Sequence, residues 1–294
     1  MDMTIKALVV GATGTVAKPV AHELLARGAD VYALVRDSSR ATVLPEGVTP
    51  VVGDLTDRAA VRAALKGMDS VFFVHPHMDD DVAIIHAFVD ACEEAGVRMV
   101  FGGYHVDDPE IRATISRQIP MYGGKLEVAA RIADPQVDSV ILNLPNFAQN
   151  DELFFDEIRA GLFPIPIADG GTGRFDLRDS GEIAARAMLD ETYLANGWYN
   201  LSGPETLNGP QCAAIWSEEL GRPVRYLQDG DDWKAIFSER LEGRKLEDWL
   251  VAHDMLVGKV PQPVNPDDLA FTTKILGRPP RTYRDFVKDA IKNF

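Results

Sequence analysis

The chain has 294 residues, 46% of them hydrophobic and 26% charged, which is ordinary for a globular protein with one large core or two unequal lobes. Its formal net charge of −15 argues against binding to a nucleic-acid backbone or to an anionic membrane surface, because both tasks require a basic face. The two cysteines support neither a disulfide framework nor a thiolate zinc site.

The beginning of the chain predicts a strand, a glycine-rich turn, a helix and a second strand. Residues 5–10 are a continuous apolar run, typical of a strand buried on both faces. Residues 11–17 hold the glycine turn, and the helix that follows ends at Gly28. A second apolar run over residues 31–35 ends at Arg36. Together these elements form a βαβ unit of the kind that begins a dinucleotide-binding sheet.

The turn has a sequence that suits a pyrophosphate. Gly11 allows the chain to leave the strand sharply, and Gly14 lets backbone N–H groups approach a phosphate without a Cβ in the way. Ala17 is small enough for the helix and the strand to pack closely. The phosphates would then lie at the positive end of the helix dipole. A structural turn without a ligand is the alternative.

After Arg36 the apolar pattern continues to alternate between short strands and helices. Strands are predicted at residues 49–52, 70–74, 98–101 and 139–144. Helices are predicted at residues 57–65, 82–95 and 125–133, and a polar loop precedes the last of them. The sequence therefore predicts an α/β fold with a Rossmann-type, doubly wound parallel sheet.

Beyond residue 144 this alternation is lost, which predicts a smaller and mostly helical C-terminal lobe. Residues 145–150 form a loop at the carboxyl end of a strand, where open α/β sheets bind ligands. Asp179 and Glu182 have the spacing of a capping box for a helix, and residues 198–201 predict another strand. A long helical region is predicted over residues 231–260.

Three short motifs stand in a specific order along the chain: Gly11-Ala12-Thr13-Gly14, Asp54-Leu55 and Gly203-Pro204-Glu205. In this order they resemble an atypical short-chain dehydrogenase/reductase of the NmrA-like branch. The segments 127–150 and 276–283 are similar to that branch as well. The resemblance implies an NAD(P)-binding Rossmann domain at residues 1–150, to which residues 176–202 return. It also implies a substrate-binding lobe made of residues 151–175 and 203–294.

The resemblance assigns cofactor contacts residue by residue. It places five residues around the pyrophosphate: Gly11, Thr13, Gly14, Thr15 and Val16. Asp54 and Leu55 would border the adenine, and His75 and Pro76 would lie near the nicotinamide ribose. Arg36 stands where an acidic residue would accept hydrogen bonds from a ribose 2′-OH, and an arginine there complements a 2′-phosphate. NADP(H) is therefore favoured over NAD(H).

The chemistry of this chain departs from the pattern of the larger family. Most short-chain dehydrogenases use a Tyr-x-x-x-Lys pair, which is absent here, and Gly102-Gly103 replaces the customary serine after the fifth strand. Tyr122 and Lys125 are three residues apart and share a face of a helix, and both are candidates for catalytic residues. Lys125 is the first candidate for a catalytic or nicotinamide-orienting residue, and Tyr104 or His105 is the alternative proton donor. In a third possibility, water completes the reduction or the protein does no chemistry.

The C-terminal lobe offers side chains for an apolar substrate. The candidates for such a pocket are Asn146, Phe147, Phe154, Phe155 and Trp233. We therefore expect an NADP(H)-dependent oxidoreductase that transfers hydride to a small or medium, largely apolar carbonyl, quinone or enone. The alternative is a non-catalytic, NAD(P)-sensing regulatory protein of the NmrA type, because fold alone does not decide function.

The remaining expectations concern location and partners. No run approaches the roughly 18 apolar residues that span a bilayer, and no charged and apolar leader precedes the first strand. A cytoplasmic protein that binds a small molecule, and neither nucleic acid nor a membrane, is expected, as a monomer or a homodimer. His75 and His77, with the acidic residues 79–81, lack the convergent spacing of a zinc site, so no metal is expected.

Overall fold

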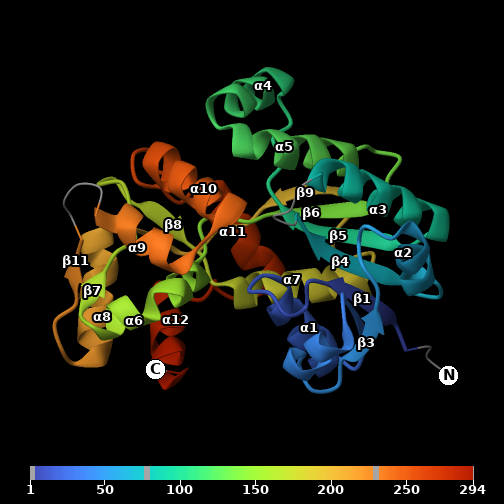
Figure 1. Ribbon diagram of the computed structural model, residues 1–294, viewed down its shortest axis with the longest axis horizontal. Helices are drawn as coiled ribbons and strands as arrows, with labels where there is room; N and C mark the ends of the chain where they lie inside the picture. Colours follow the sequence, from blue (N-terminus) through green and yellow to red (C-terminus); the bar gives the residue numbers. More distant parts are fainter. Residues whose placement is uncertain (1–3, 76–79, 228–231, 294) are drawn as a thin grey trace. The chain divides into compact units, whose positions relative to one another are not determined.

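The computed structural model describes residues 4–75, 80–227 and 232–293 (Figure 1). The chain divides into two compact units, each made of two segments. We call Met1–Leu144 with Leu177–Asn200 the sheet unit, and Pro145–Asp176 with Leu201–Phe294 the C-terminal unit. Among the described residues, no helix has the length and apolar character needed to cross a membrane.

The sheet unit is built on seven parallel strands in the order β3-β2-β1-β4-β5-β6-β9. The strands are β1 Lys6–Val10, β2 Asp30–Val35, β3 Thr49–Val52, β4 Ser70–Val74, β5 Arg98–Gly103, β6 Ser139–Asn143 and β9 Gly197–Asn200. This arrangement confirms the predicted Rossmann-type fold. The strand order reverses between β1 and β4, and open α/β sheets bind ligands beyond the carboxyl ends of the strands at such a point.

The centre of the sheet is apolar on both faces, as the uninterrupted hydrophobic runs predict. Ala7, Leu8 and Val9 of β1 are fully buried. Leu8 pairs with Tyr32 on one side and with Val71 on the other. The burial of such runs supplies most of the stabilisation of a parallel sheet, because both of its faces are covered by helices.

Helices cover the two faces of the sheet (Figure 1). One face carries α1 Ala17–Ala26 and α7 Leu177–Leu189, and the other carries α2 Arg58–Leu65, α3 Asp81–Ala95 and α5 Pro120–Ile132. The pair α1 and α7 packs closely, because a Cβ on Gly181 would lie only 2.8 Å from the backbone of Pro19. A 3-10 helix at Ser38–Val43 completes this part of the chain.

The polar loop predicted before α5 is wrong, because the structure has a further helix there, α4 Pro109–Gln118. Asp108 caps its first turn by accepting from the backbone N–H groups of Glu110 and Ile111, and Pro109 occupies an early helical position. No residue of α4 is buried, so the helix lacks the apolar stripe by which sequence patterns reveal helices. Figure 1 shows it beyond α5, on the side away from the sheet.

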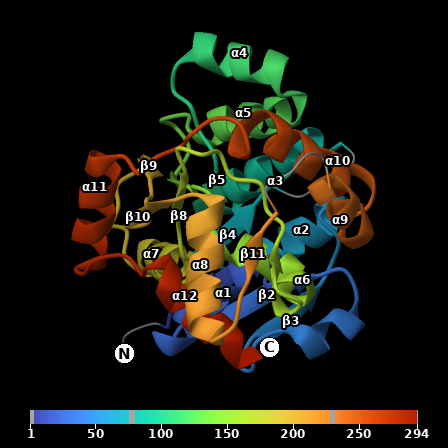
Figure 2. The ribbon, with the colours of Figure 1, turned by 90° about the vertical axis from the view of Figure 1, so that its left-hand side faces the viewer.

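The C-terminal unit combines two small sheets with helices. Its strands are β7 Leu162–Phe163 paired with β11 Arg225–Tyr226, and β8 Thr172–Arg174 paired with β10 Glu205–Leu207. Its helices are α6 Phe155–Arg159, α8 Gly209–Leu220, α9 Asp232–Arg240, α10 Gly243–Ala252, α11 Pro266–Leu276 and α12 Tyr283–Ala290. Short helical turns span Ala148–Phe154, His253–Val257 and Ile291–Asn293. Figure 2 shows α8 and α12 side by side.

The single helix predicted over residues 231–260 is wrong, because the described part of this region holds α9, α10 and the turn at His253–Val257. The break falls between Arg240 and Gly243, and Gly243 has a φ of +56°. The aromatic side chains of this region belong to the core of the unit, where Trp233 and Phe237 are buried with Phe154 and Trp216.

His253 lies in this aromatic core, and its side chain makes the stability of the unit depend on pH. Its ring lies 5.0 Å from that of Phe237 and 5.3 Å from that of Trp249, and its Nδ1 donates to the Trp249 carbonyl over 2.8 Å. Burial lowers the pKa of His253 to about 4; the Trp249 carbonyl opposes this fall, and the Arg174 charge adds to it. The folded state therefore holds His253 neutral at pH values where the unfolded chain already binds a proton.

We expect the free energy of unfolding to fall as the pH is lowered, by about 2 kcal/mol from this histidine between about pH 7.5 and pH 5. His253→Phe removes the titration and keeps an aromatic ring, so its stability should change less over the same interval. Urea denaturation at the two pH values measures this difference, with the exposed His22→Gln as control. An unchanged pH dependence in His253→Phe would contradict the assignment.

Candidate functional site

The glycine turn lies directly after β1, and its shape fits a pyrophosphate. Gly11 has a φ of +79°, a backbone conformation that favours glycine, and the Gly14 N–H donates to the Gly11 carbonyl over 2.7 Å. A Cβ on Gly14 would lie 3.2 Å from that carbonyl oxygen. Thr13 and Thr15 are exposed, and no side chain caps the N–H groups at the start of α1. The turn therefore offers backbone donors and a helix N-terminus to an anion.

The ends of β2 and β3 bring Arg36 and Asp54 near each other. Arg36 is exposed immediately after β2, and its charge contributes to a lowered pKa of Asp54. The larger cause is that Asp54 accepts from the N–H and the hydroxyl of Thr56, over 2.8 and 2.7 Å. Leu55 is half-buried against the core of the sheet unit. Arg36 and Asp54 thus stand at the edge of the sheet where the resemblance places the adenosine half of the cofactor.

Asp37 follows Arg36 and bears on the choice between the two dinucleotides. Its carboxylate caps the 3-10 helix that begins at Ser38, accepting from the N–H of Ser39 over 2.9 Å and from the Ser39 hydroxyl. These hydrogen bonds lower the pKa of Asp37, and the Arg40 charge adds to the effect. The carboxylate of Asp37 is therefore engaged by its own loop.

At the end of β4, His75 lies beside an acidic residue. Its side chain is almost completely buried, with Nδ1 3.6 Å from a carboxylate oxygen of Asp81 in α3. Pro76, predicted beside it near the nicotinamide ribose, and His77 and Asp79 of the rejected metal cluster lie outside the described residues. Among the residues that are described, no three His, Cys, Asp or Glu side chains form a group that could hold a metal.

Three of the four predicted catalytic residues lie together in the sheet unit. Tyr104 directly follows β5, and its ring makes an edge contact with that of Tyr122, with 6.0 Å between the centroids. The Lys125 ammonium lies 5.6 Å from the centroid of the Tyr122 ring, which confirms the predicted shared face of α5. Partial burial raises the pKa of Tyr104, so its hydroxyl is protonated at neutral pH. The cluster therefore pairs a phenol donor with a nearby cation.

His105, the fourth, is badly placed for the role of proton donor. Its side chain is only 5% exposed and its ring lies 4.7 Å from that of Trp198. Burial, followed by the Arg112 charge, lowers the pKa of His105, with Asp107 opposing. A neutral imidazole is not a general acid at neutral pH, because its one N–H group is far too weak an acid. The side chain is not solvated, because Trp198 of β9 covers it.

The backbone of His105 is held by a residue that the sequence pattern did not single out. Asn143, at the end of β6, accepts from the His105 N–H over 2.7 Å and donates to its carbonyl over 3.0 Å. The same amide donates to Asn200 of β9 over 2.8 Å. Asn143 therefore ties together the carboxyl ends of β5, β6 and β9 and fixes the loop that carries Tyr104. An asparagine at the end of a buried strand was the available signal.

Gly102 and Gly103 stand in place of the customary serine, and at Gly103 there is no room for a larger side chain. Both belong to β5, which runs two residues further than predicted. A Cβ on Gly103 would come within 2.1 Å of the ring of Phe101, so any larger residue would displace that buried ring. The structure therefore provides no serine hydroxyl at this position, and the predicted departure from the larger family stands.

In the C-terminal unit, the predicted pocket residues have different surroundings. Asn146 and Phe147 are half-buried, and Phe155 is partly buried against the core of the unit. Phe154 is fully buried and stacks on Phe237 with 4.6 Å between the rings, and Trp233 is 6% exposed in the same core. Packing in this core accounts for the burial of Phe154 and Trp233, and their role as substrate contacts stays a prediction.

A buried ionic network underlies the loop that holds Asn146. The side chains of Arg174 and Asp151 are both 0% exposed and form an ion pair over 2.5 Å. Burial raises the pKa of the Asp151 carboxyl, while the Arg174 charge and a hydrogen bond from Tyr283 oppose the rise. The Tyr283 hydroxyl donates to Asp151 and accepts from the Trp216 indole N–H over 2.8 Å. The sequence pattern gave no sign of this network, because its members come from four separate elements.

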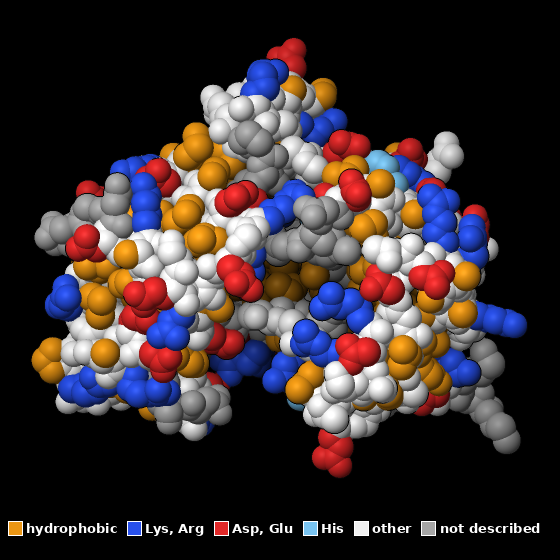
Figure 3. All heavy atoms as spheres, viewed as in Figure 1, with side chains coloured by type: hydrophobic (Ala, Val, Ile, Leu, Met, Phe, Trp, Pro, Cys, Tyr) orange, Lys and Arg blue, Asp and Glu red, His pale blue; other side chains and the backbone are white. Residues whose placement is uncertain are grey.

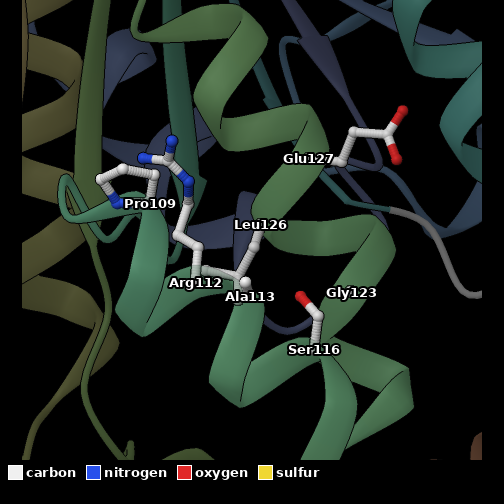
Figure 4. Close-up of a pocket in the computed structure, with 7 residues that line it drawn as sticks. All are labelled: Pro109, Arg112, Ala113, Ser116, Gly123, Leu126 and Glu127. Atoms are coloured by element: carbon white, nitrogen blue, oxygen red, sulfur yellow. The ribbon is translucent and has the colours of Figure 1, made fainter.

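A shallow hollow of about 350 Å³ lies between α4 and α5 in the sheet unit (Figure 4). It is lined by Pro109, Arg112, Ala113, Ser116, Gly123, Leu126 and Glu127. The Arg112 guanidinium donates to the carbonyls of Val106 and Asp107, so it braces the start of α4. None of the predicted site residues lines this hollow. On the face shown in Figure 3, acidic and basic side chains are interspersed.

Comparisons with known proteins bear on the family and the fold of the chain. The model of the NmrA-like family matches residues 3–237. The NAD(P)H azoreductase of Xenophilus azovorans is 30% identical over 288 residues, covering 96% of each protein. A structure of the Escherichia coli NADPH-dependent quinone oxidoreductase with NADPH has a TM-score of 0.77 over 97% of this chain and 99% of its own, at 20% identity. A structure of NmrA, a negative transcriptional regulator, has a TM-score of 0.72 over 97% of this chain and 95% of its own, at 16% identity.

Proposed function

The chain belongs to the NmrA-like family, and from that premise we propose that it is an NADP(H)-dependent reductase. Its substrate would be a small or medium, largely apolar carbonyl, quinone or enone. The azoreductase relative supports a reductase, because the similarity extends over 96% of both chains. The sheet unit is the proposed dinucleotide domain, and the C-terminal unit is the proposed substrate lobe.

One observation carries the proposal: the glycine turn and the Tyr104–Tyr122–Lys125 cluster both belong to the sheet unit. The turn follows β1, and Tyr104 follows β5, so both lie beyond carboxyl ends of strands in one parallel sheet. Such ends are where α/β sheets bind dinucleotides and assemble catalytic groups. The turn would hold the phosphates, and the cluster would meet the reacting end.

The protein's part in the reaction would be to orient and polarise. When bound, the nicotinamide supplies the hydride. Lys125 would place a positive charge near the oxygen on which negative charge develops, and Tyr104 would hold a proton for that oxygen. Asn143 would keep Tyr104 in place through the backbone of His105. Gly102-Gly103 offers no serine for this task, so Tyr104 and Lys125 are the donors that the sheet unit would supply.

The proposed preference for NADP(H) rests on Arg36. A charge-assisted hydrogen bond to a 2′-phosphate contributes about 1.5–3 kcal/mol, so Arg36→Ala should raise the Kd for NADPH roughly 10- to 100-fold and leave that for NADH nearly unchanged. Fluorescence titration of both dinucleotides measures this. Arg117→Ala, at an exposed position of α4, is the matched control. Equal Kd values for NADPH and NADH in the wild-type protein would contradict the preference.

The second candidate function is a non-catalytic dinucleotide sensor. The fold similarity to the regulator NmrA favours it, and fold alone does not separate the two. Purified protein assayed for NADPH oxidation with quinones, ketones and azo dyes distinguishes them. Oxidation that depends on an acceptor supports the reductase. Tight NADPH binding without oxidation in the presence of any of these acceptors supports the sensor.

A further inference from the structure

The side chain of Asn146 is held in one orientation by a buried arginine. A guanidinium nitrogen of Arg174 donates to the Asn146 side-chain oxygen over 2.5 Å, and its other terminal nitrogen pairs with Asp151. Arg174 also stacks on the ring of Tyr283, with 4.8 Å from its central carbon to the ring centroid. Because Arg174 has no exposed side-chain surface, it cannot turn away from these partners without leaving the core.

The backbone around Asn146 is fixed as well. Its carbonyl accepts from the Phe175 N–H over 3.1 Å, and the Phe175 carbonyl accepts from the Ala148 N–H over 2.7 Å. These bonds join the loop to the residue next to Arg174 in the chain, so one segment holds both the main chain and the side chain of Asn146. The loop begins directly after β6.

The chemistry of arginine decides which end of the amide faces it. A guanidinium group has donors and no acceptor, so the atom of Asn146 that meets it is the oxygen. The amide NH₂ group must then point away from Arg174. Among the described residues, none accepts a hydrogen bond from this nitrogen, and the side chain is half-buried. Asn146 therefore presents two oriented N–H donors, with the cost of ordering them already met by folding.

We propose that Asn146, positioned by Arg174, is the group that binds the lone-pair atom of the hydride acceptor. This inference rests on the proposed reductase function and gives its substrate a chemical class: a neutral acceptor with a carbonyl or quinone oxygen, or an azo nitrogen. Such atoms accept hydrogen bonds and carry no proton of their own. The Asn146 amide cannot rotate to offer its oxygen. It therefore rejects substrates that present a hydrogen-bond donor at this position, because two donors would then face each other without a hydrogen bond.

The substitution Asn146→Asp tests the direction of this hydrogen bond. The carboxylate has almost the same shape and still accepts from Arg174, but it replaces the NH₂ donors by a second oxygen. We expect kcat/KM for a neutral quinone such as 1,4-benzoquinone to fall at least about 10-fold, the loss expected when a substrate hydrogen bond becomes a repulsion. We expect the Kd for NADPH and the thermal midpoint to stay close to wild-type values.

A cationic triarylmethane dye separates recognition from a merely structural role. It accepts hydride at carbon and becomes neutral, and it offers no carbonyl or azo atom at that centre. Asn146→Asp should therefore leave kcat/KM for the dye unchanged or raise it, whereas a loop that had lost its shape would lower both activities together. Asn265→Asp is the matched control, because the Asn265 side chain caps α11 by accepting from the N–H groups of Asp267 and Asp268, which an aspartate does equally well. Asn146→Ala serves as a second variant if the aspartate lowers the thermal midpoint.

Four results would count against the proposal. Wild-type kcat/KM for the quinone in both Asn146 variants would overturn it while leaving the reductase function intact. An equal loss with quinone and dye, or a loss with quinone accompanied by a weaker Kd for NADPH, would assign Asn146 to the structure of the loop and overturn it as well. If the wild-type protein does not oxidise NADPH in the presence of any of the acceptors, the reductase function itself fails, and the acceptor class inferred from Asn146 fails with it.

Discussion

Replacing Asp151 by asparagine is expected to lower the free energy of unfolding by about 3–5 kcal/mol, the largest single effect that the structure predicts. The change leaves the Arg174 guanidinium buried without an anionic partner, and arginine does not lose its proton to relieve this. Burial of Asp151 already raises the pKa of its carboxyl, so the native ion pair depends on Arg174 and Tyr283 to compensate for the loss of water.

Urea denaturation of four proteins measures this effect: the wild type, Asp151→Asn, Arg174→Met and the double variant. The double variant should recover part of the loss, because neither charge is then buried alone. Glu94→Gln is the surface control, since Glu94 and its partner Arg62 keep more than half of their side-chain surface exposed and such pairs contribute less than about 1 kcal/mol. An Asp151→Asn protein as stable as the control would contradict a charged pair in this core.

Replacing Lys125 by methionine is expected to lower kcat by about 100-fold with little change in fold. Methionine and lysine have similar helix propensities, so α5 should form as before. The lost group is the cation beside Tyr122, and removing one such electrostatic contact to a developing negative charge costs roughly 100- to 1,000-fold in rate. Steady-state kinetics with NADPH and a quinone, alongside the Kd for NADPH, measure the effect.

The division between kcat and Kd decides the role of Lys125. A fall in kcat with an unchanged Kd for NADPH assigns Lys125 to the chemical step. A weaker Kd with unchanged kcat would make it a ribose contact only and would contradict the catalytic assignment. The exposed Lys66→Met, at the end of α2, is the control for loss of charge in the same unit. Tyr104→Phe, measured in parallel, tests whether the neighbouring hydroxyl supplies the proton.

The sequence predicted best those features that depend on residues close together in the chain. The apolar runs of β1 and β2, the glycine turn between β1 and α1 and the alternation that follows are local patterns, and all of them appear in the structure. The turn at Gly11 is predictable because only a few residue types tolerate its positive φ. Pattern failed for α4, whose lack of a buried face leaves the cap at Asp108 as the only signal.

The environment of the candidate site was less predictable, because it depends on contacts between distant segments. His105 was a candidate proton donor from its loop position, but Trp198, 93 residues later, covers its ring, and burial lowers its pKa. Phe154 and Asn146 looked alike as pocket residues, but one packs in the core and the other is held by Arg174. No periodicity encodes the pairing of Arg174 with Asp151, which are brought together only when the C-terminal unit folds.

The central claim is that this chain transfers hydride from NADPH to a small neutral acceptor. Its most direct test follows the absorbance of NADPH when purified wild-type protein is mixed with 1,4-benzoquinone or an azo dye, with NADH measured in parallel. We predict catalytic oxidation that requires both protein and acceptor, is faster with limiting NADPH than with limiting NADH, and is reduced about 100-fold in Lys125→Met. Saturable binding of NADPH with no acceptor-dependent oxidation would contradict the claim and identify a dinucleotide sensor instead.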